Sequence, residues 1–436
     1  MKEGEAGFYY CGPTVWNYGH IGNFRSAVAA DILRRYLKFK GFRVTHVMNI
    51  TDVDDRIISE AQKAGVSIDD YTAKYIDAFW EDFDALGCER PEVVPRATRH
   101  IPEMATLIGQ LISSEHAYRS DDSIYYRIAS FPSYGKLSKI NFAGNIAGAS
   151  ERVDTDKYEK EDARDFALWK GPSTETEPAW DTSIGRGRPG WHIECSAMSW
   201  KHLGETFDIH GGGIDLVFPH HENEIAQSRC AFHTPLMANF WMHNGFLQVE
   251  GEKMSKSLGN FVTINDLLKE WPGEVIRFTM LQTHYRQPMN WTLSGLRESQ
   301  KNLDHWYKLT GDAAPGYLCA DTVDALLDDL NTPKAFAALH ELRGEAAKGA
   351  KPAAASLKAS AQLIGLLQLS PAQWAGFRPA SAAVDENKVV SLIEARNSAR
   401  KAKNFKEADR IRDELTAMGI ELEDTKDGKT KWKVAR

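Results

Sequence analysis

The sequence lacks long hydrophobic runs. None of its apolar stretches reaches the roughly 18 to 20 residues that a membrane-spanning helix needs. The first five residues, Met1 to Glu5, also lack the apolar segment of a secretory signal. We therefore expect a cytoplasmic protein with no membrane partner.

Cysteine is scarce and has no paired spacing. A chain of 436 residues contains five cysteines, at positions 11, 88, 195, 230 and 319. An odd number without regular spacing argues against a disulfide framework. The chemistry expected of these thiols is therefore metal binding or reactivity.

The chain also lacks an excess of positive charge. It has 53 basic and 60 acidic residues, for a net charge of −7, which argues against a protein that coats nucleic acid indiscriminately. The charge is nevertheless polarised. Residues 388–436 carry thirteen basic and nine acidic side chains, a net charge of +4, so the remainder of the chain carries −11.

What is present is typical of a folded α/β protein. Hydrophobic residues make up 42% and charged residues 26%, and the length suggests about three domains of roughly 150 residues each. Residues 7–11 and 42–50 predict strands, and the apolar spacing over 23–40 predicts the helix between them. Such a unit winds right-handed and binds its ligand at the carboxyl ends of the strands, where Cys11 and Thr51 fall.

The rest of the chain divides by composition. Residues from about 100 to 180 read as a helix and then a stretch of weak periodicity, which predicts an insertion. Sequence typical of a sheet core resumes over 190–213. The Ala- and Leu-rich segment from 293 to 369 predicts a helical bundle. Pro371 to Ala383 predicts a linker, and a basic helix with a short strand follows it.

A possible metal site centres on residues 218–224. Pro219 predicts a helix that begins near His220, on which both His220 and His221 lie close to Glu224. Periodicity alone does not choose between these two histidines. Cys230 would point to another face, whereas Cys11 and Cys195 could complete a zinc site of about four ligands. The alternative is a pair of small buried cysteines and a solvated His/Glu turn.

Two short motifs suggest phosphate binding. His20 to Asn23 lies at the start of the first predicted helix, where backbone N–H groups and the helix dipole favour anions. Lys253 to Ser257 reads as a mobile loop whose lysines could stabilise a departing pyrophosphate. The alternatives are an ordinary turn and an exposed basic loop.

Together these motifs resemble those of cysteinyl-tRNA synthetase over almost the whole chain. The resemblance rests on Cys11-Gly12-Pro13-Thr14-Val15, His20-Ile21-Gly22-Asn23, Asn49 to Asp55, Trp191 to Met198, His210 to Gly213, His220 to Glu224, Lys253 to Ser257, Arg277-Phe278, His284 to Arg286 and Phe405 to Arg412.

The resemblance implies a class I synthetase with an α/β fold. Its catalytic domain would be a Rossmann-type parallel sheet split by a connective insertion, followed by a helical bundle and a small anticodon-binding domain. The expected boundaries are 1–100 and 181–232 for the two halves of the catalytic domain, 101–180 for the insertion, 233–292 for a stem-contact segment with the KMSKS loop, 293–376 for the bundle and 385–436 for the anticodon-binding domain.

The resemblance also assigns roles to single residues. One zinc ion would be held by Cys11, Cys195, His220 and Glu224, with His221 left for a supporting role. The cysteine substrate would lie among Gly12, Thr51, Trp191 and His210. ATP, accompanied by Mg²⁺, would contact Thr14, His20, Asn23, Asp215 and Lys256, and His20, Asn23, Lys253 and Lys256 would be catalytic.

The implied reaction explains why the site would contain a metal. Cysteine and serine differ by one atom, and shape alone discriminates between near-isosteres by only roughly 1 to 3 kcal/mol. Zinc binds a soft thiolate, whereas a serine hydroxyl is a poor zinc ligand. We expect the substrate thiolate to join the protein ligands while its carboxylate attacks the α-phosphate of ATP. The resulting cysteinyl adenylate would be passed to the terminal ribose of tRNA(Cys), through its 2′-hydroxyl. We expect a monomer.

The basic C-terminal residues fit an RNA partner. We expect contacts to tRNA phosphates, and Trp432 offers a face for an unstacked base. The alternative is a solvated amphipathic helix with a core tryptophan. The basic candidates are Arg396, Arg400, Lys401, Lys403, Lys406, Arg410 and Arg412.

One departure and three rival interpretations remain. The first strand begins within about ten residues of Met1, whereas family members usually have a longer lead-in. If residues are missing here, we expect a less stable sheet edge, although none of the motifs is lost. The rivals are a cysteine ligase that acts on a sugar amine in mycothiol synthesis, a non-catalytic zinc- and RNA-binding paralogue, and a methionine enzyme of the same class. The last is disfavoured because its usual zinc-knuckle spacing is absent.

Overall fold

The structure is a computed structural model of the chain. It describes residues 3–139, 162, 164–255, 258–380, 386–402, 404–418, 420–424 and 430–434, so that the predicted site residue Lys256 and the basic candidate Lys403 lie outside the described residues. Contacts divide the chain into two compact units. One contains residues 1–264 and 273–368, and the other contains residues 265–272 and 369–436.

A four-stranded parallel sheet forms the centre of the larger unit. Its order is β2 (Arg43–Met48), β1 (Glu5–Tyr10), β8 (Phe207–Gly213) and β9 (Ala238–Asn244). Helix α1 (Ile21–Phe39) connects β1 to β2, as the sequence predicted. The predicted α/β fold with a parallel sheet is therefore confirmed, and both halves of the sheet place their carboxyl ends at one edge.

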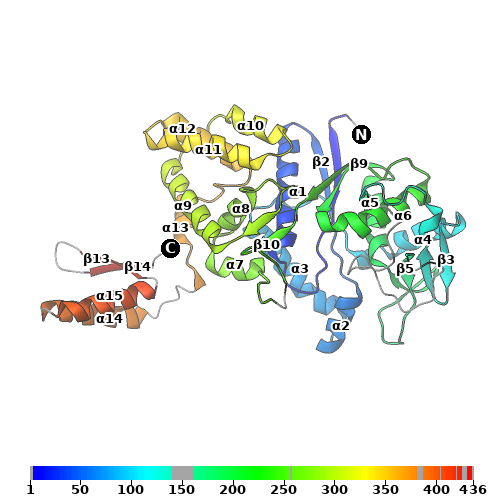
Figure 1. Cartoon of the computed structure of the whole chain (residues 1–436), viewed down its shortest axis with the longest axis horizontal. Coiled ribbons are helices and arrows are strands. Elements are labelled where there is room, and N and C mark those ends of the chain that lie inside the picture. The colour runs from blue at the N-terminus through cyan, green and yellow to red at the C-terminus, as the bar shows by residue number, and fades with distance from the viewer. Residues whose placement is uncertain are drawn as a thin grey trace. The chain divides into compact units, whose positions relative to one another are not determined.

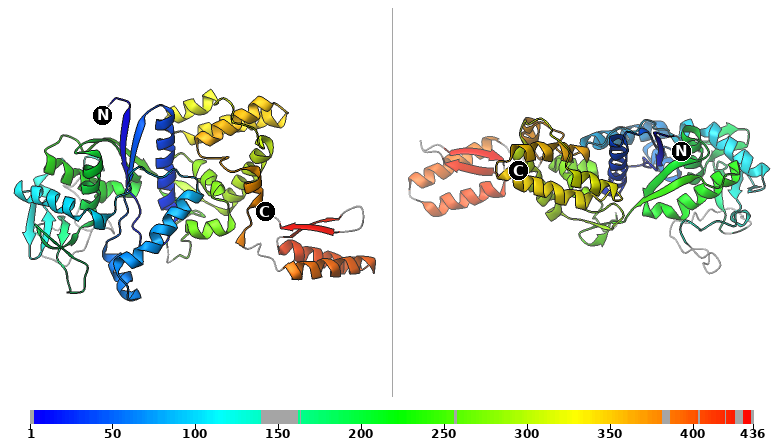
Figure 2. Two further views of the ribbon diagram at one scale, coloured as in Figure 1. Left: turned by 180° about the vertical axis from the view of Figure 1, so that it is seen from behind. Right: turned by 90° about the horizontal axis from the view of Figure 1, so that it is seen from above.

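Helices cover both sides of this sheet. Figures 1 and 2 show α1 on one side and α4 (Ile101–Ser113), α5 (Trp191–Leu203) and α6 (Glu222–Phe232) on the other. The second group packs into one apolar core that includes Leu107, Ile193 and Ala226, all fully buried. Helices α2 (Asp55–Ala64) and α3 (Ile68–Ala85) follow β2.

The predicted insertion contains a second sheet. Its five strands have the order β3, β4, β5, β7, β6 and pair antiparallel. The sequence showed little periodicity here because β4 and β5 are buried on both faces and therefore do not alternate. The strands are β3 (Ala117–Ser120), β4 (Ser123–Tyr126), β5 (Phe166–Lys170), β6 (Trp180–Thr182) and β7 (Gly185–Pro189).

One local expectation was wrong. The segment from Trp191 was expected to belong to the sheet, but it forms α5, whose burial on nearly every side hides the helical period. After β2, Thr51 and Asp52 are residue types that commonly cap helices, yet the N-cap of α2 is Asp54, whose carboxylate accepts a hydrogen bond from the Ile57 N–H. Asp52 instead accepts hydrogen bonds from Arg96 and Thr98.

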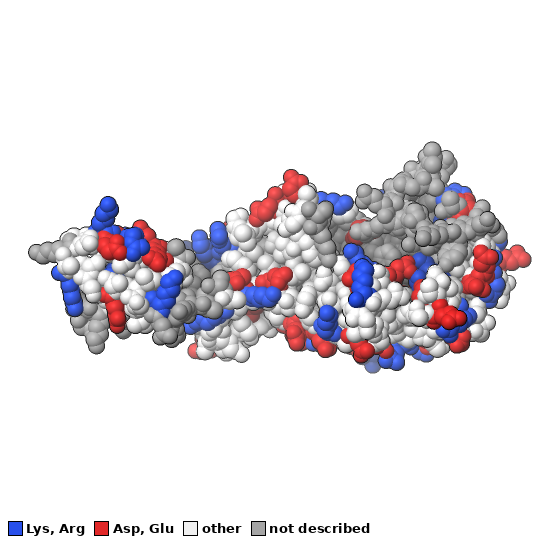
Figure 3. Space-filling model, turned by 90° about the horizontal axis from the view of Figure 1, so that it is seen from below, with Lys and Arg blue, Asp and Glu red and all other residues white. Residues whose placement is uncertain are grey.

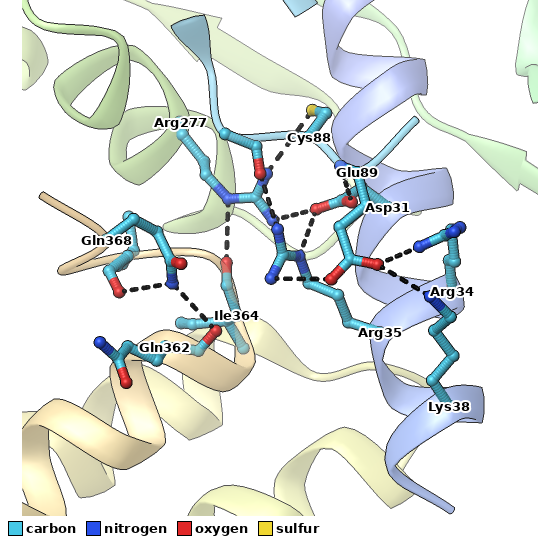
Figure 4. A network of polar contacts seen from close by, with 12 residues as sticks. Asp31, Arg34, Arg35, Lys38, Cys88, Glu89, Arg277, Gln362, Ile364 and Gln368 are labelled. Atoms are coloured by element: carbon cyan, nitrogen blue, oxygen red, sulfur yellow. Dashed lines mark hydrogen bonds and ion pairs between the residues drawn. The ribbon is translucent and has the colours of Figure 1, made fainter. Parts of the chain in front are cut away.

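The predicted helical bundle is present in the larger unit. Its helices are α8 (Gly273–Leu281), α9 (Leu293–Thr310), α10 (Ala320–Leu327), α11 (Thr332–Ala347) and α12 (Lys351–Leu363). A small sheet is formed by β10 (Leu247–Val249) and β11 (Glu252–Lys253), which precede α8, and β12 (Met289–Trp291), which lies between α8 and α9. Figure 4 shows Arg277 of α8 between Asp31 of α1 and the carbonyl of Ile364, so one buried guanidinium joins the bundle to the first helix.

The smaller unit is built on a helical pair and a hairpin. It contains most of α7 (Ile264–Glu270), then α13 (Pro371–Gly376), α14 (Glu386–Lys401), α15 (Phe405–Ala417), β13 (Ile420–Asp424) and β14 (Thr430–Val434). Part of the predicted linker is therefore the short helix α13, which a Ser370–Gln373 capping box begins. Trp432 is partly buried against the core of this unit, as its structural alternative proposed.

Charge in this unit is mixed. Acidic and basic side chains are interspersed on the face that Figure 3 shows at the left. Arg410 forms ion pairs with Glu407 and Glu414, and Arg412 pairs with Asp409, all within α15. The predicted RNA contact Arg396 is buried. The exposed candidates are Arg400, Lys401, Lys406, Arg410 and Arg412. Every helix among the described residues is too short or too polar to cross a membrane.

Candidate active site

A cavity of about 950 Å³ opens at the carboxyl ends of the central strands and brings the predicted residues together. His210 and Glu224 are buried beside it, and Lys256 lies outside the described residues. The predicted residues that line the cavity are Cys11, Gly12, Thr14, His20, Asn23, Thr51, Trp191, Cys195, Asp215, His220 and Lys253.

One end of the cavity contains the predicted metal ligands. The donor atoms of Cys11, Cys195, His220 and Glu224 all lie within 4.8 Å of one another. Cys11 follows β1 and Cys195 lies in α5, while Glu224 is in the first turn of α6. His220 lies in the turn Val217–His221 that precedes α6. Three segments far apart in sequence therefore converge on one point.

The ambiguity between the two histidines persists in the geometry. The donor atoms of a second set also lie within 4.8 Å of one another; this set contains Cys11, His210, His221 and Glu224. Glu224 Oε1 lies 3.1 Å from His220 Nε2, while its Oε2 lies 2.8 Å from His210 Nε2. His221 Nε2 is 4.0 Å from Oε1. The two sets differ in sulfur, since only the first contains Cys195.

A layer of aromatic rings surrounds these ligands. Trp191 stacks on His220 with ring centres 4.3 Å apart, and Trp241 stacks on His210 at 4.6 Å. His192 Nδ1 lies 2.9 Å from His220 Nδ1, and His243 Nε2 lies 2.8 Å from His221 Nδ1.

Sequence reasoning missed three members of this layer, His192, Trp241 and His243. One signal could have found two of them. Trp241 and His243 lie near the carboxyl end of β9, beside β8, and this is the sheet edge where ligands bind.

The protonation of the cluster follows from its burial. Burial lowers the pKa of His220 and of His221 well below the usual value, so both imidazoles are neutral and can act as ligands. Burial also raises the pKa of the Cys11 thiol and of the Glu224 carboxyl. A cation would favour the deprotonated forms of both groups. Two sulfurs, one imidazole nitrogen and one carboxylate oxygen make a donor set that fits zinc.

The wall next to the metal end is shaped by Gly12 and Thr51. A Cβ on Gly12 would lie 1.7 Å from the carbonyl oxygen of Asn49, so only glycine fits there. The Gly12 N–H donates to Asn49 Oδ1 at 2.9 Å. The Thr51 hydroxyl donates to Glu194 Oε2 at 2.9 Å, which fixes its orientation.

His20 caps helix α1 at the cavity wall. Its Nδ1 accepts hydrogen bonds from the N–H groups of Gly22 and Asn23, at 3.1 and 3.3 Å, and Asn23 Oδ1 accepts from the His20 N–H. Because Nδ1 is an acceptor, the proton of the neutral ring lies on Nε2. The helix therefore presents an imidazole N–H donor beside its positive end.

The lysine loop is tied to this helix start. Lys253 lines the cavity, and its carbonyl accepts a hydrogen bond from the Asn260 side chain. The end of the loop is hydrogen-bonded to the start of α1, since the Ile21 N–H donates to the Val262 carbonyl at 3.1 Å. Ile264 N–H likewise donates to the Gly19 carbonyl. The two phosphate motifs of the sequence therefore form one wall.

Asp215 and the loop after β9 also line the cavity. Asp215 lies in a short helical turn, Ile214–Leu216, directly after β8. Arg25, which the sequence reasoning missed, donates to the carbonyls of Gly245 and Phe246 at 3.0 and 2.8 Å. It is 3% exposed, so a charged residue on the buried face of α1 holds the cavity-lining loop in place.

Family models cover most of the chain. The model described as "tRNA synthetases class I (C) catalytic domain" matches residues 1–301. A "DALR domain" matches residues 323–370, and a "Cysteinyl-tRNA ligase anticodon binding domain" matches residues 387–432.

Similar proteins agree with these models. A cysteine–tRNA ligase of a Bradyrhizobium species is 52% identical over 100% of this chain and 96% of its own length. One from Xanthobacter autotrophicus is 52% identical over 98% of this chain and 94% of its own.

Solved structures support the fold at low identity. Methionyl-tRNA synthetase of Mycobacterium tuberculosis has a TM-score of 0.58 at 14% identity, over 85% of this chain and 93% of its own. A leucyl enzyme of Agrobacterium radiobacter has a TM-score of 0.59 at 12% identity, over 86% of each chain. The motifs, the cavity and the full-length similarity lead to one conclusion: the chain belongs to the class I cysteinyl-tRNA synthetases, the cysteine–tRNA ligases.

Proposed function

We propose that this cysteine–tRNA ligase activates L-cysteine as cysteinyl adenylate and transfers it to tRNA(Cys), with zinc selecting the substrate. One observation carries the proposal. A thiol, imidazole and carboxylate cluster lies in the same cavity as a helix N-terminus, an imidazole donor and a lysine. The thiol, imidazole and carboxylate cluster suits a soft metal, whereas the helix N-terminus with its imidazole donor and lysine suits a triphosphate.

Cys11, Cys195, His220 and Glu224 would hold the zinc ion. When bound, zinc supplies a Lewis acid that prefers a thiolate to a hydroxyl, a distinction that shape alone cannot make. The indole of Trp191 and the backbone at Gly12 would confine the small side chain, and Thr51 would orient it. His210, through its contact with Glu224, would hold that carboxylate in position.

The activation step needs placement and charge stabilisation rather than a protein base. The cysteine carboxylate is already ionised at neutral pH and can attack the α-phosphate directly. The N-terminus of α1, the His20 Nε2–H and Lys253 would stabilise negative charge on the phosphates. Asn23 keeps the His20 cap in place. Thr14 and Asp215 remain the proposed contacts to the nucleotide, and Mg²⁺ would accompany ATP.

The test is charging of purified tRNA by the zinc-loaded protein. We expect cysteine-dependent ATP–pyrophosphate exchange and acid-precipitable labelled cysteine on tRNA(Cys). Exchange without charging would favour a ligase that uses an amine acceptor instead. Absence of exchange in a folded, metal-loaded sample would reject catalysis at this site.

A further inference from the structure

One segment of the insertion is hydrogen-bonded to the start of α6, next to the candidate metal ligands. It follows the short helical turn Ile128–Ser130 and comprises residues 131–138, which we call the strap. The chain turns at Gly135, whose φ of 90° is a conformation that glycine favours. The insertion therefore reaches the helix that begins at the metal site.

The centre of this contact is the carboxylate of Glu222, which is 1% exposed. Its Oε2 accepts a hydrogen bond from the Gly135 N–H at 3.0 Å, and its Oε1 accepts from the N–H and the hydroxyl of Ser138 at 2.7 and 2.9 Å. Among the described residues this carboxylate has no ion-pair partner. Its charge is stabilised by these three donors and by the positive end of α6.

Two further contacts extend the strap along α6. The Tyr134 hydroxyl donates a hydrogen bond to Oδ1 of Asn223, which is also buried. The guanidinium of Arg229, in the last turn of α6, lies 5.1 Å from the ring centre of Phe131. The strap therefore contacts this helix from its first turn to its last.

Glu222 and Asn223 lie between the two candidate ligands His220 and Glu224 in the sequence. A helix turns by about 100° per residue, so Glu222 points about 200° away from Glu224 around the axis. Within the described residues, neither Leu216, before the turn Val217–His221, nor His221, before α6, makes a side-chain capping hydrogen bond. The strap is thus placed to fix a helix start that its own caps do not fix.

We propose that Glu222 is a positioning residue for the metal, and that its hydrogen bonds to the strap hold His220 and Glu224 in their ligating arrangement. Metal ligands must converge to within a few tenths of an ångström, so a turn that relaxes binds metal less tightly. This inference rests on the proposed function for the identity of the metal. It goes beyond that function because it gives the insertion a part in holding the metal site.

The test measures zinc affinity by competition with a chromophoric chelator, beside the melting temperature of each metal-free variant. Glu222→Gln keeps the size of the side chain but replaces one acceptor oxygen by an amide that cannot accept. Tyr134→Phe removes the second hydrogen bond and keeps the ring. Tyr118→Phe is the matched control, because the Tyr118 hydroxyl donates at 3.0 Å to Asp165, a carboxylate within the insertion.

We expect Glu222→Gln to weaken zinc binding by about tenfold, the lower end of the loss caused by removing a group that orients a metal ligand. Tyr134→Phe should weaken it by a smaller factor, and Tyr118→Phe should bind zinc as wild type does. Cysteine-dependent exchange by Glu222→Gln should fall at limiting zinc and recover at saturating zinc, with the KM for ATP unchanged.

The alternative is that Glu222 only stabilises the insertion. A lower melting temperature with wild-type zinc affinity in Glu222→Gln would establish that alternative. Equal losses of zinc affinity in Tyr134→Phe and Tyr118→Phe would also overturn the proposal, and this pair decides the question if Glu222→Gln does not fold. Absence of zinc binding by the wild-type protein would reject the metal of the proposed function itself, whereas wild-type affinity in both strap variants would reject only the role of the strap.

Discussion

Buried donor groups determine the chemistry at the residue scale. His220 and Glu224 were predicted four positions apart on a helix face, and their side chains meet at 3.1 Å. The sequence could not choose His220 over His221, because the turn Val217–His221 brings both imidazoles toward Glu224. It also could not locate His192, whose contact with His220 depends on how α5 approaches the turn Val217–His221.

Metal content of single variants tests the ligand set. Cys195→Ala removes a sulfur that only the first of the two candidate clusters contains, so it should lose most of the bound zinc. Cys230 contacts the Tyr126 hydroxyl and belongs to neither cluster, which makes Cys230→Ala the matched control. The measurement is zinc per chain by elemental analysis after dialysis. Equal zinc in both variants would contradict the assignment and favour the cluster with His210 and His221.

A second prediction concerns stability in acid. His46 is buried against Phe8, and burial, with a further effect of Arg34, lowers the pKa of its imidazole to about 3. The folded state therefore keeps His46 neutral, whereas the unfolded state gains a proton below its ordinary pKa of about 6.5. Stability is lost as the pH falls from about 6.5 toward 3.

The variant His46→Phe keeps an aromatic ring there but cannot be protonated. Between pH 7 and pH 5.5 it should lose about 1.3 kcal/mol less unfolding free energy than wild type. Urea denaturation at the two pH values measures this difference. His305→Phe changes an exposed histidine and should follow the wild-type pH dependence. Parallel curves for wild type and His46→Phe would show that His46 is not kept neutral.

At the scale of elements, the helices α1 and α8 do most to hold the parts of the larger unit in position. The start of α1 was visible in the sequence as a His-x-Gly-Asn turn, and the structure confirms a helix there. The ion pair between Asp31 on that helix and Arg277 on α8 was not visible, because 246 positions separate the two residues and no local pattern links them. Burial raises the pKa of Asp31, but Arg277 and Arg35 outweigh that effect and hold it below the usual value.

Arg277→Met should therefore be strongly destabilising. It leaves the Asp31 carboxylate buried with Arg35 as its remaining cationic partner, and breaking a buried pair costs about 3 to 5 kcal/mol. Adding Asp31→Asn removes the buried charge and should recover part of the loss. Arg286→Met breaks an exposed pair with Asp329 and should cost less than about 1 kcal/mol. Urea unfolding measures all of these variants; similar costs for the two arginine variants would contradict the role of burial.

The cap of α1 gives a prediction on catalysis. A Cβ on Gly22 would lie 2.9 Å from the His20 ring, so Gly22→Ala should displace the imidazole from its cap. The maximal rate of pyrophosphate exchange should fall by at least about tenfold, because the donors lose their alignment with the phosphates. Gly344→Ala, in α11, meets no atom within 4 Å and is the control. Wild-type exchange in Gly22→Ala would show that the position of His20 does not matter.

At the scale of the whole molecule, the sequence predicted the α/β class of architecture with its parallel sheet, which the structure confirms. It did not predict the antiparallel sheet of the insertion, since short strands buried on both faces carry no alternating pattern. Nor did the sequence show that Arg396, one of the basic residues expected to contact tRNA, is buried. Arg410 and Arg412 are exposed and pair with acidic neighbours along α15.

Lys401 and Lys406 are the better candidates for tRNA contacts in the smaller unit. The double variant Lys401→Glu with Lys406→Glu should raise the KM for tRNA by about tenfold, through lost phosphate contacts, and reduce its dependence on salt. Cysteine-dependent exchange should not change. Lys301→Glu with Lys308→Glu makes an equal charge change on α9 and should have a smaller effect. Equal effects of the two double variants would assign the loss to net charge alone.

The most direct test of the whole account is cysteine-dependent ATP–pyrophosphate exchange by the zinc-loaded protein, with serine supplied at the same concentration. The account predicts strong exchange with cysteine and none above background with serine. Exchange with both amino acids would contradict selection by a thiol-binding metal. No exchange with either would contradict activation of cysteine in this cavity.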